Sequence, residues 1–265
     1  MNLKQKYGEW ALVCGATDGI GKAFAEYFAA NGLSVVLVGR RAEKLQVLAE
    51  ELEQGYGVKA MAVPQDLTAD SASENLIKAT ESLDIGILNY VATFHKMGRY
   101  SHAAYPDIQK IIDININTYA KLLHHFTALF AARDRGAVVT MTSLTAVTAS
   151  PYNAAYGAAK AFQLILTEGV AREFHDADVD ILVITAGSTQ TPDWFRNQPQ
   201  GDIDNSQAMT PQEVVEEGMG MLGKANSYIV GRINQDAYKK YTAEMTRDEA
   251  AALMGSYFEE EYRDK

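Results

Sequence analysis

The sequence has very little cysteine: Cys14 is the one thiol in 265 residues, so no disulfide can form within the chain. A protein without disulfides suits a reducing compartment, and we expect this one to be cytoplasmic. Cys14 falls in an apolar run that predicts a buried strand. In that setting a thiol acts as a small hydrophobic side chain rather than as a reactive group.

Basic residues and long apolar runs are also scarce. Lysines and arginines number 24 against 34 aspartates and glutamates, which gives a net charge of −10. An acidic chain repels phosphate backbones and anionic lipids, so we expect no nucleic-acid partner and no membrane partner. No apolar run approaches the ~20 residues that span a bilayer, and residues 1–10 lack the apolar core of a signal peptide. We also expect no bound metal ion.

Apolar runs and helix-like patterns alternate along the chain. The runs predict strands at residues 10–14, 34–39, 58–63, 85–91, 137–142, 179–185 and 227–230. Several are apolar throughout, which is typical of parallel strands that helices cover on both faces. Between them, apolar residues recur at helical spacing, as from Leu45 to Leu52. We therefore predict an α/β fold: a single-domain, Rossmann-type, doubly wound parallel sheet over residues 1–265.

Two segments depart from this alternation. Residues 187–209 are rich in polar residues and proline, yet contain Trp194 and Phe195, which predicts a substrate-covering loop. A surface loop anchored by two aromatic side chains is the alternative. The C-terminal extension, residues 235–265, contains five aromatic residues. It could pack on its own core, on a partner subunit, or over the mouth of a site.

A glycine-rich turn follows the first predicted strand. It reads Gly15-Ala16-Thr17-Asp18-Gly19-Ile20-Gly21 and leads into a predicted helix. Glycines let the backbone approach a pyrophosphate, and the helix N-terminus offers free N–H groups. We expect a dinucleotide cofactor here, in contact with Gly15, Thr17, Asp18, Gly19, Ile20 and Gly21. A plain glycine-rich connection is the alternative.

Arg40 and Arg41 follow the second predicted strand, where a site that prefers NAD has a carboxylate for the ribose 2′-hydroxyl. Two guanidinium groups can instead bind a 2′-phosphate, so we predict NADP(H). A solvated basic pair is the alternative, although cations at a helix start oppose the helix dipole. Asp66 and Leu67 follow the third strand, and the Asp66 carboxylate could accept a hydrogen bond from the adenine amino group.

A candidate proton-transfer site occupies the middle of the chain. Ser143 ends the fifth strand, and Tyr156 and Lys160 are four residues apart on the next predicted helix, so they share one face. A carbonyl that accepts a hydride builds negative charge on oxygen, which Tyr156 can neutralise by donating its proton. We expect the Lys160 ammonium and the cationic oxidised nicotinamide to lower the pKa of this phenol. Ser143 can polarise the carbonyl, and Lys160 can also hold the nicotinamide ribose.

Asn115 is the fourth candidate residue of this site. It interrupts an apolar helical stripe of Ile108, Ile111 and Ile112. A buried amide without partners is costly, so Asn115 must be bonded within the protein. It could be an ordinary core asparagine, or it could hold a water that links Lys160 to solvent.

With these residues in this order, the chain resembles the short-chain dehydrogenases/reductases over roughly residues 8–232. Further stretches resemble the bacterial NADP-dependent 7β-hydroxysteroid dehydrogenases that act on bile acids: residues 1–3, 6–10, 38–41, 90–92, 130–132, 134–138, 150–151 and 254–257. The resemblance implies a cytoplasmic homodimer or homotetramer with a small apolar alcohol or ketone as substrate. It further implies cofactor contacts from Asn89, Tyr90, Thr189 and Thr191, and substrate contacts from Trp194 and Phe195.

The sequence therefore predicts an NADP(H)-dependent oxidoreductase that interconverts a secondary alcohol and a ketone, on a hydroxysteroid or bile acid. Two alternatives stay open. The substrate could be another bulky apolar carbonyl compound, or the protein could bind NADP(H) without catalysis.

Overall fold

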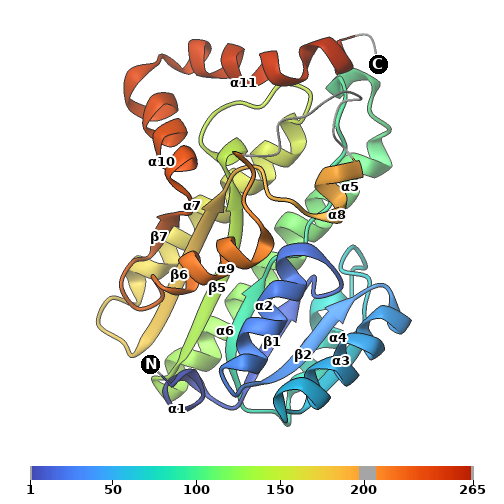
Figure 1. The fold of residues 1–265 in the computed structure, drawn as a ribbon, viewed down its shortest axis with the longest axis vertical. Coiled ribbons are helices and arrows are strands. Elements are labelled where there is room, and N and C mark those ends of the chain that lie inside the picture. The colour runs from blue at the N-terminus through green and yellow to red at the C-terminus, as the bar shows by residue number, and fades with distance from the viewer. Residues whose placement is uncertain (1, 197–206, 264–265) are drawn as a thin grey trace.

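The computed structural model describes residues 2–196 and 207–263. Its centre is a parallel sheet with the strand order β3-β2-β1-β4-β5-β6-β7 (Figure 1). The strands are β1 (Trp10–Cys14), β2 (Ser34–Gly39), β3 (Ala60–Pro64), β4 (Ile85–Tyr90), β5 (Gly136–Ser143), β6 (Val179–Ala186) and β7 (Ser227–Ile229). The predicted Rossmann-type sheet is confirmed, with strand ends shifted by at most two residues.

The strands are apolar throughout because both of their faces are buried. On β1, Ala11 and Val13 belong to one hydrophobic cluster, whereas Leu12 and Cys14 belong to the other. One helix layer consists of α2 (Gly19–Ala30), α3 (Ala42–Tyr56) and α9 (Pro211–Met219). The opposite layer includes α4 (Ala72–Thr80), α6 (Thr118–Arg133) and α7 (Ala154–Glu173). Helices therefore cover both faces, as predicted.

The strand order reverses at β1, which pairs with β2 on one side and with β4 on the other. At such a point the connections leave in opposite directions and open a crevice at the carboxyl ends of the strands. The glycine turn follows β1 at this edge, and Ser143 ends β5 at the same edge. The topology thus brings both predicted parts of the site to one end of the sheet.

Shorter helices lie above that edge. They are α5 (Tyr105–Ile112), the π-helical turn η2 (Asp113–Asn117), the 3-10 turns η1 (Tyr100–His102) and η3 (Leu144–Ala146), and α8 (Pro192–Arg196). The remaining short helix, α1 (Leu3–Tyr7), lies at the opposite end, where Lys6 and Tyr7 bond to Asp180.

The C-terminal extension packs on its own chain. It comprises α10 (Arg232–Lys239), the π-helical turn η5 (Lys240–Glu244) and α11 (Arg247–Tyr262), which form an arm above the sheet (Figure 1). Tyr241 and Met254 of the arm form a small cluster with Val147. Gly255 lies so close to Pro151 that a Cβ at Gly255 would be 2.9 Å from the proline ring. The described part of the extension therefore covers the loop that follows Ser143.

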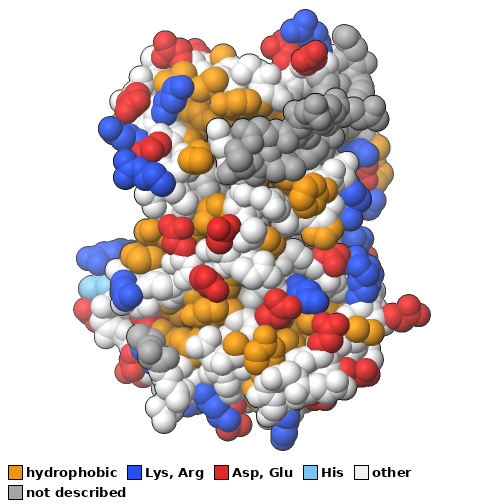
Figure 2. Space-filling view, in the orientation of Figure 1, with side chains coloured by type: hydrophobic (Ala, Val, Ile, Leu, Met, Phe, Trp, Pro, Cys, Tyr) orange, Lys and Arg blue, Asp and Glu red, His pale blue; other side chains and the backbone are white. Residues whose placement is uncertain are grey.

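Both acidic and basic side chains are spread over the face shown in Figure 2. No helix among the described residues is long and apolar enough to cross a membrane.

Candidate active site

The structure brings Asn115, Ser143, Tyr156 and Lys160 together at the carboxyl edge of the sheet. The Ser143 hydroxyl lies close enough to the Tyr156 phenol to lower its pKa. The Lys160 amine lies 5.7 Å from the centre of the Tyr156 ring. Asn115 reaches the phenol through Thr93, which bonds both Asn115 and Tyr156. The four side chains predicted from the sequence thus belong to one connected group.

Helix α7 is fixed to β5 at Lys160. The Thr142 hydroxyl donates to the backbone carbonyl of Lys160 at 3.0 Å. In return, the Lys160 amine donates to the Met141 carbonyl at 3.0 Å and to the side-chain oxygen of Gln163 at 2.8 Å. Lys160 is only 3% exposed. This burial lowers the pKa of its amine to about 7.

The environment of Tyr156 differs from the one expected from the sequence. Removal of water from around the phenol raises the pKa of Tyr156 to about 12, although its contacts with the Ser143 and Thr93 hydroxyls act in the opposite direction. The negative charge of Asp193 raises this pKa further. Lys160 is not among the groups that shift the pKa of Tyr156 here, and burial lowers the pKa of its own amine.

Asn115 lies in η2, a π-helical turn between α5 and α6. Such turns interrupt a helix and often occur at functional sites. The Asn115 amide donates to the carbonyls of Phe94 at 3.1 Å and Ile111 at 3.0 Å, and its oxygen accepts from Thr93 at 2.8 Å. The side chain therefore anchors the segment after β4 beside Tyr156. Both N–H donors of the side chain are used within the protein, and the role of Asn115 in holding a water beside Lys160 stays a prediction.

His95 and Asp193 belong to this site and were not predicted. The ring centres of His95 and Tyr156 are 5.5 Å apart, and His95 Nδ1 lies 3.4 Å from Asp193 Oδ2. Burial lowers the pKa of His95, the Asp193 carboxylate opposes that effect, and Lys160 adds to it. The position of His95 shortly after a strand end was a usable signal, because such loops gather at the site edge.

The glycine turn forms a cradle that side chains would fill. Gly15 has φ +99°, and a Cβ there would lie 2.8 Å from the Ala92 backbone. A Cβ on Gly21 would lie 2.0 Å from the Gly15 carbonyl oxygen. Asp18 precedes α2, which begins at Gly19 and Ile20. This close approach of bare backbone to a helix N-terminus fits a pyrophosphate.

Arg41 lies beside this turn. Its guanidinium donates to Thr17 Oγ1 at 2.6 Å and to Asp18 Oδ2 at 2.5 Å. Arg40 is exposed next to it.

On the adenine side, Asp66 is also exposed, but its Oδ1 accepts hydrogen bonds from the backbone N–H and the hydroxyl of Thr68. Leu67, by contrast, is a buried core residue.

Asn89 and Tyr90, which are predicted to contact the cofactor, end strand β4. Both are fully buried in β4. Asn89 donates to the Val139 carbonyl at 3.1 Å, and the Tyr90 hydroxyl donates to the Ile114 carbonyl. These two side chains hold the sheet and η2 together, and the cofactor contact of the two residues stays a prediction. Ala92, which approaches Gly15, lies closer to the cradle.

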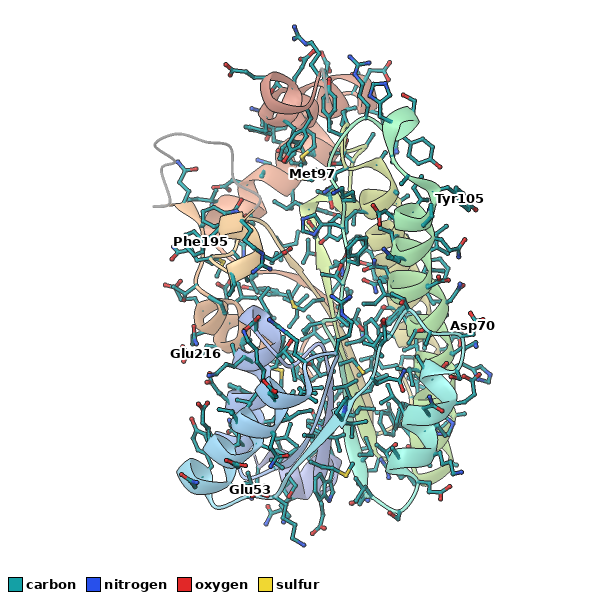
Figure 3. All side chains as sticks on the ribbon, turned by 90° about the vertical axis from the view of Figure 1, so that its right-hand side faces the viewer. Glu53, Asp70, Met97, Tyr105, Phe195 and Glu216 are labelled. Carbon is teal, nitrogen blue, oxygen red and sulfur yellow. The ribbon has the colours of Figure 1, made fainter. Side chains whose placement is uncertain are left out.

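The stem of the 187–209 loop lies over the glycine turn. A Cβ on Gly19 would be 2.9 Å from the Thr191 methyl group, and Thr191 Oγ1 accepts from the Trp194 backbone at 3.1 Å at the start of α8. Thr189 is buried and forms a bridge with Met209. Phe195 is 53% exposed and faces outward at the end of α8 (Figure 3). Residues 197–206 of this predicted loop lie outside the described residues.

Within the described ranges, no group of three or more His, Cys, Asp or Glu side chains could hold a metal ion.

Comparisons with known proteins agree with the geometry. A model of the short chain dehydrogenase family matches residues 9–200. The 7β-hydroxysteroid dehydrogenase of Collinsella aerofaciens is 45% identical over 261 residues, which cover 97% of this chain and 99% of that protein. The enzyme of the same name from Clostridium sardiniense is 42% identical, and the match covers 98% of this chain and 99% of that protein.

Solved structures of short-chain dehydrogenases are also similar to this chain. One from a study of 7β-hydroxysteroid dehydrogenase stereoselectivity has a TM-score of 0.90 at 45% identity, covering 96% of this chain and 99% of that one. A short-chain dehydrogenase from Sphingobium yanoikuyae in complex with NADPH has a TM-score of 0.76 at 27% identity, covering 83% and 86%.

The chain therefore belongs to the short-chain dehydrogenase family, whose members use NAD(P)H. Within that family it is an oxidoreductase similar to the 7β-hydroxysteroid dehydrogenases along nearly its whole length, which confirms the predicted resemblance.

Proposed function

We propose that this protein is an NADP(H)-dependent 7β-hydroxysteroid dehydrogenase that interconverts the 7β-hydroxyl and 7-keto groups of bile acids. The connected group of Ser143, Tyr156 and Lys160 is the main support for catalysis. The similarity of 42–45% over nearly the full length supports the substrate class. Arg41 beside the glycine turn supports NADP(H) over NAD(H).

The cofactor would lie along the carboxyl edge of the sheet. Its pyrophosphate would lie at the glycine turn and its 2′-phosphate beside Arg40 and Arg41. Thr191, which packs on Gly19, and Thr189 would complete the cofactor side. When bound, NADP(H) exchanges a hydride with the carbon that bears the oxygen.

The residues of the chain then handle the proton. Ser143 hydrogen-bonds the substrate oxygen and polarises it. Tyr156 donates its proton when a ketone is reduced and accepts one when an alcohol is oxidised. Lys160 lies beneath the phenol ring and favours the deprotonated phenol whenever its amine is charged. Asn115 and Thr93 keep the segment after β4 in contact with the phenol.

The substrate would enter between the loop that follows Ser143 and the described part of the 187–209 loop. Trp194 packs edge-on against Phe195 with 5.0 Å between ring centres, and both would contact an apolar steroid. The C-terminal arm packs against Pro151 in the loop that follows Ser143, on the other side of this entrance. The substrate-covering role of the loop is part of this proposal.

Assembly as a homodimer or homotetramer in the cytoplasm also belongs to the proposal. Leu129 on α6 and Phe162 and Ile165 on α7 are exposed apolar side chains on neighbouring helices. A second subunit would cover them. Sedimentation equilibrium on the purified protein tests this: a monomer at micromolar concentration would contradict it.

The activity is tested by offering the purified protein NADP⁺ with a panel of 3α-, 7α-, 7β- and 12α-hydroxy bile acids and recording absorbance at 340 nm. Oxidation of the 7β-hydroxy compounds is expected. Activity on other bulky alcohols, with no response to any bile acid, would leave the fold and site intact but replace the substrate. No turnover of any alcohol or ketone would favour a protein that binds NADP(H) without catalysis.

A further inference from the structure

A glutamine outside the four-residue site holds the catalytic lysine. Gln163 lies one helical turn after Lys160 on α7 and is 0% exposed. Its side-chain oxygen accepts a hydrogen bond of 2.8 Å from the Lys160 amine. The other protein acceptor for this amine is the backbone carbonyl of Met141, at 3.0 Å. Gln163 therefore supplies the side-chain acceptor that places the amine.

The nitrogen of the same amide, Gln163 Nε2, has no hydrogen-bond partner among the described residues, although the atom is buried. A buried donor without an acceptor costs free energy, whereas a methionine or leucine of similar volume would avoid that cost. Turning the amide over would set its two N–H donors against the amine of Lys160. The amine therefore fixes the orientation of the amide.

We propose that Gln163 is a positioning residue of the proton-transfer site: its side-chain oxygen holds the Lys160 amine beneath the Tyr156 ring and stabilises the charged form of that amine. Gln163 acts through Lys160, since its contact is with the amine rather than with the phenol. The inference rests on the proposed function for its consequence in catalysis, but the contact between the two side chains can be tested without a substrate.

Few charged groups compete with this contact. In the described part of the chain, the titratable side chains that face Lys160 are Tyr156 on α7 and His95 on the segment after β4. The Asp193 carboxylate of α8 contacts the His95 ring. Because no carboxylate among the described residues bonds the amine, the Gln163 oxygen is the side-chain acceptor whose removal changes the surroundings of the amine most directly.

Two substitutions remove the contact in different ways. Gln163→Met keeps the volume and removes the oxygen, whereas Gln163→Asn keeps an amide that is too short to reach the amine. Thr167→Val is the matched control. Thr167 lies one turn further along the same helix face and bonds the backbone oxygen of Gln163 and the Tyr119 hydroxyl, but not Lys160. Circular dichroism and thermal melting show which variants fold.

The charge of Lys160 can be followed by NMR of protein labelled with ¹³C at lysine Cε, with Lys160→Met to assign the signal. In the wild type the signal should titrate near pH 7. In both Gln163 variants the midpoint should fall by about one pH unit, because a hydrogen bond to a charged group stabilises that form. Thr167→Val should keep the wild-type midpoint. A midpoint unchanged in the Gln163 variants would overturn the proposal.

Kinetics test the consequence for catalysis. With a 7β-hydroxy bile acid and NADP⁺, kcat of both Gln163 variants should fall by up to about tenfold near pH 7, where the wild-type amine is still partly charged and the variant amine is mostly neutral. At alkaline pH the amine is neutral in every form, so the kcat values of the variants and the wild type should converge there. Thr167→Val should lower the melting temperature and leave the pH profile in place. A profile unshifted in the Gln163 variants would contradict the inference. A wild type that oxidises no alcohol would contradict the proposed function instead, and the NMR titration would still decide the role of Gln163.

Discussion

The His95 ring lies against the Tyr156 ring, with 5.5 Å between their centres. This contact joins the segment after β4 to the catalytic helix α7. On its other side, His95 meets Asp193 of α8, so three segments that are distant in the sequence converge beside the phenol. The chemistry of Tyr156 therefore depends on the described part of the substrate loop as well as on the helix that contains it.

Asp193→Asn should move the pH dependence of alcohol oxidation to lower pH. The Asp193 carboxylate raises the pKa of Tyr156, so its removal lowers that pKa. Tyr156 accepts the substrate proton only when deprotonated, and the rising limb of kcat against pH follows its pKa. Arg196→Gln is the control, because it breaks the 3.0 Å ion pair between Arg196 and Asp193 but keeps the carboxylate. A shift to higher pH in Asp193→Asn would show that the carboxylate acts mainly by holding α8.

Arg41→Ala should weaken the preference for NADP⁺ over NAD⁺. The ratio of the two kcat/KM values should fall about tenfold or more, since a charge-assisted bond to the 2′-phosphate is lost. Lys44→Ala is the matched control, because Lys44 lies 3.5 Å from the same Asp18 carboxylate. An equal loss in both variants would point to general charge rather than to a specific phosphate contact. A carboxylate at Gly39 would be a poorer test, because a Cβ there would lie 2.8 Å from Thr17.

Asn115→Ala should destabilise the protein by about 1–3 kcal/mol, because it leaves a buried carbonyl and a part-buried carbonyl without the donor they bond here. The free energy of unfolding in urea measures this directly. Asn117→Ala, in the same π-helical turn, removes an exposed bond to Asp113 and should cost less than about 0.5 kcal/mol. Equal stability of Asn115→Ala and the wild type would mean that the amide does not anchor the segment after β4.

Much of the fold could be predicted because its signals are local. The apolar runs located the strands, and the glycine turn and helical spacing located their connections. The side of the sheet to which each strand residue points could not be predicted, because a strand that is apolar throughout shows no alternation of polar and apolar residues. For this reason the sequence could not show that the Tyr90 ring packs on Tyr119, with 5.1 Å between ring centres.

The four site residues could be predicted because their types and order are specific. Their pKa values could not, since burial decides them: the Lys160 amine was expected to lower the pKa of Tyr156, but burial weakens the charge on the amine itself. His95, Asp193 and Gln163 were not predicted. His95 and Asp193 meet across elements that spacing along the chain does not encode, whereas Gln163 lies one turn after Lys160 on α7 and was missed although helical spacing places it there.

The most direct test of the central claim compares Tyr156→Phe with the wild type in a single turnover, with enzyme and NADP⁺ in excess over a 7β-hydroxy bile acid. Loss of the phenolic proton acceptor should slow oxidation by about a hundredfold to ten-thousandfold. NADPH binding, followed by cofactor fluorescence, should stay close to the wild type. A Tyr156→Phe protein that binds NADPH and oxidises the bile acid at the wild-type rate would contradict proton transfer by Tyr156.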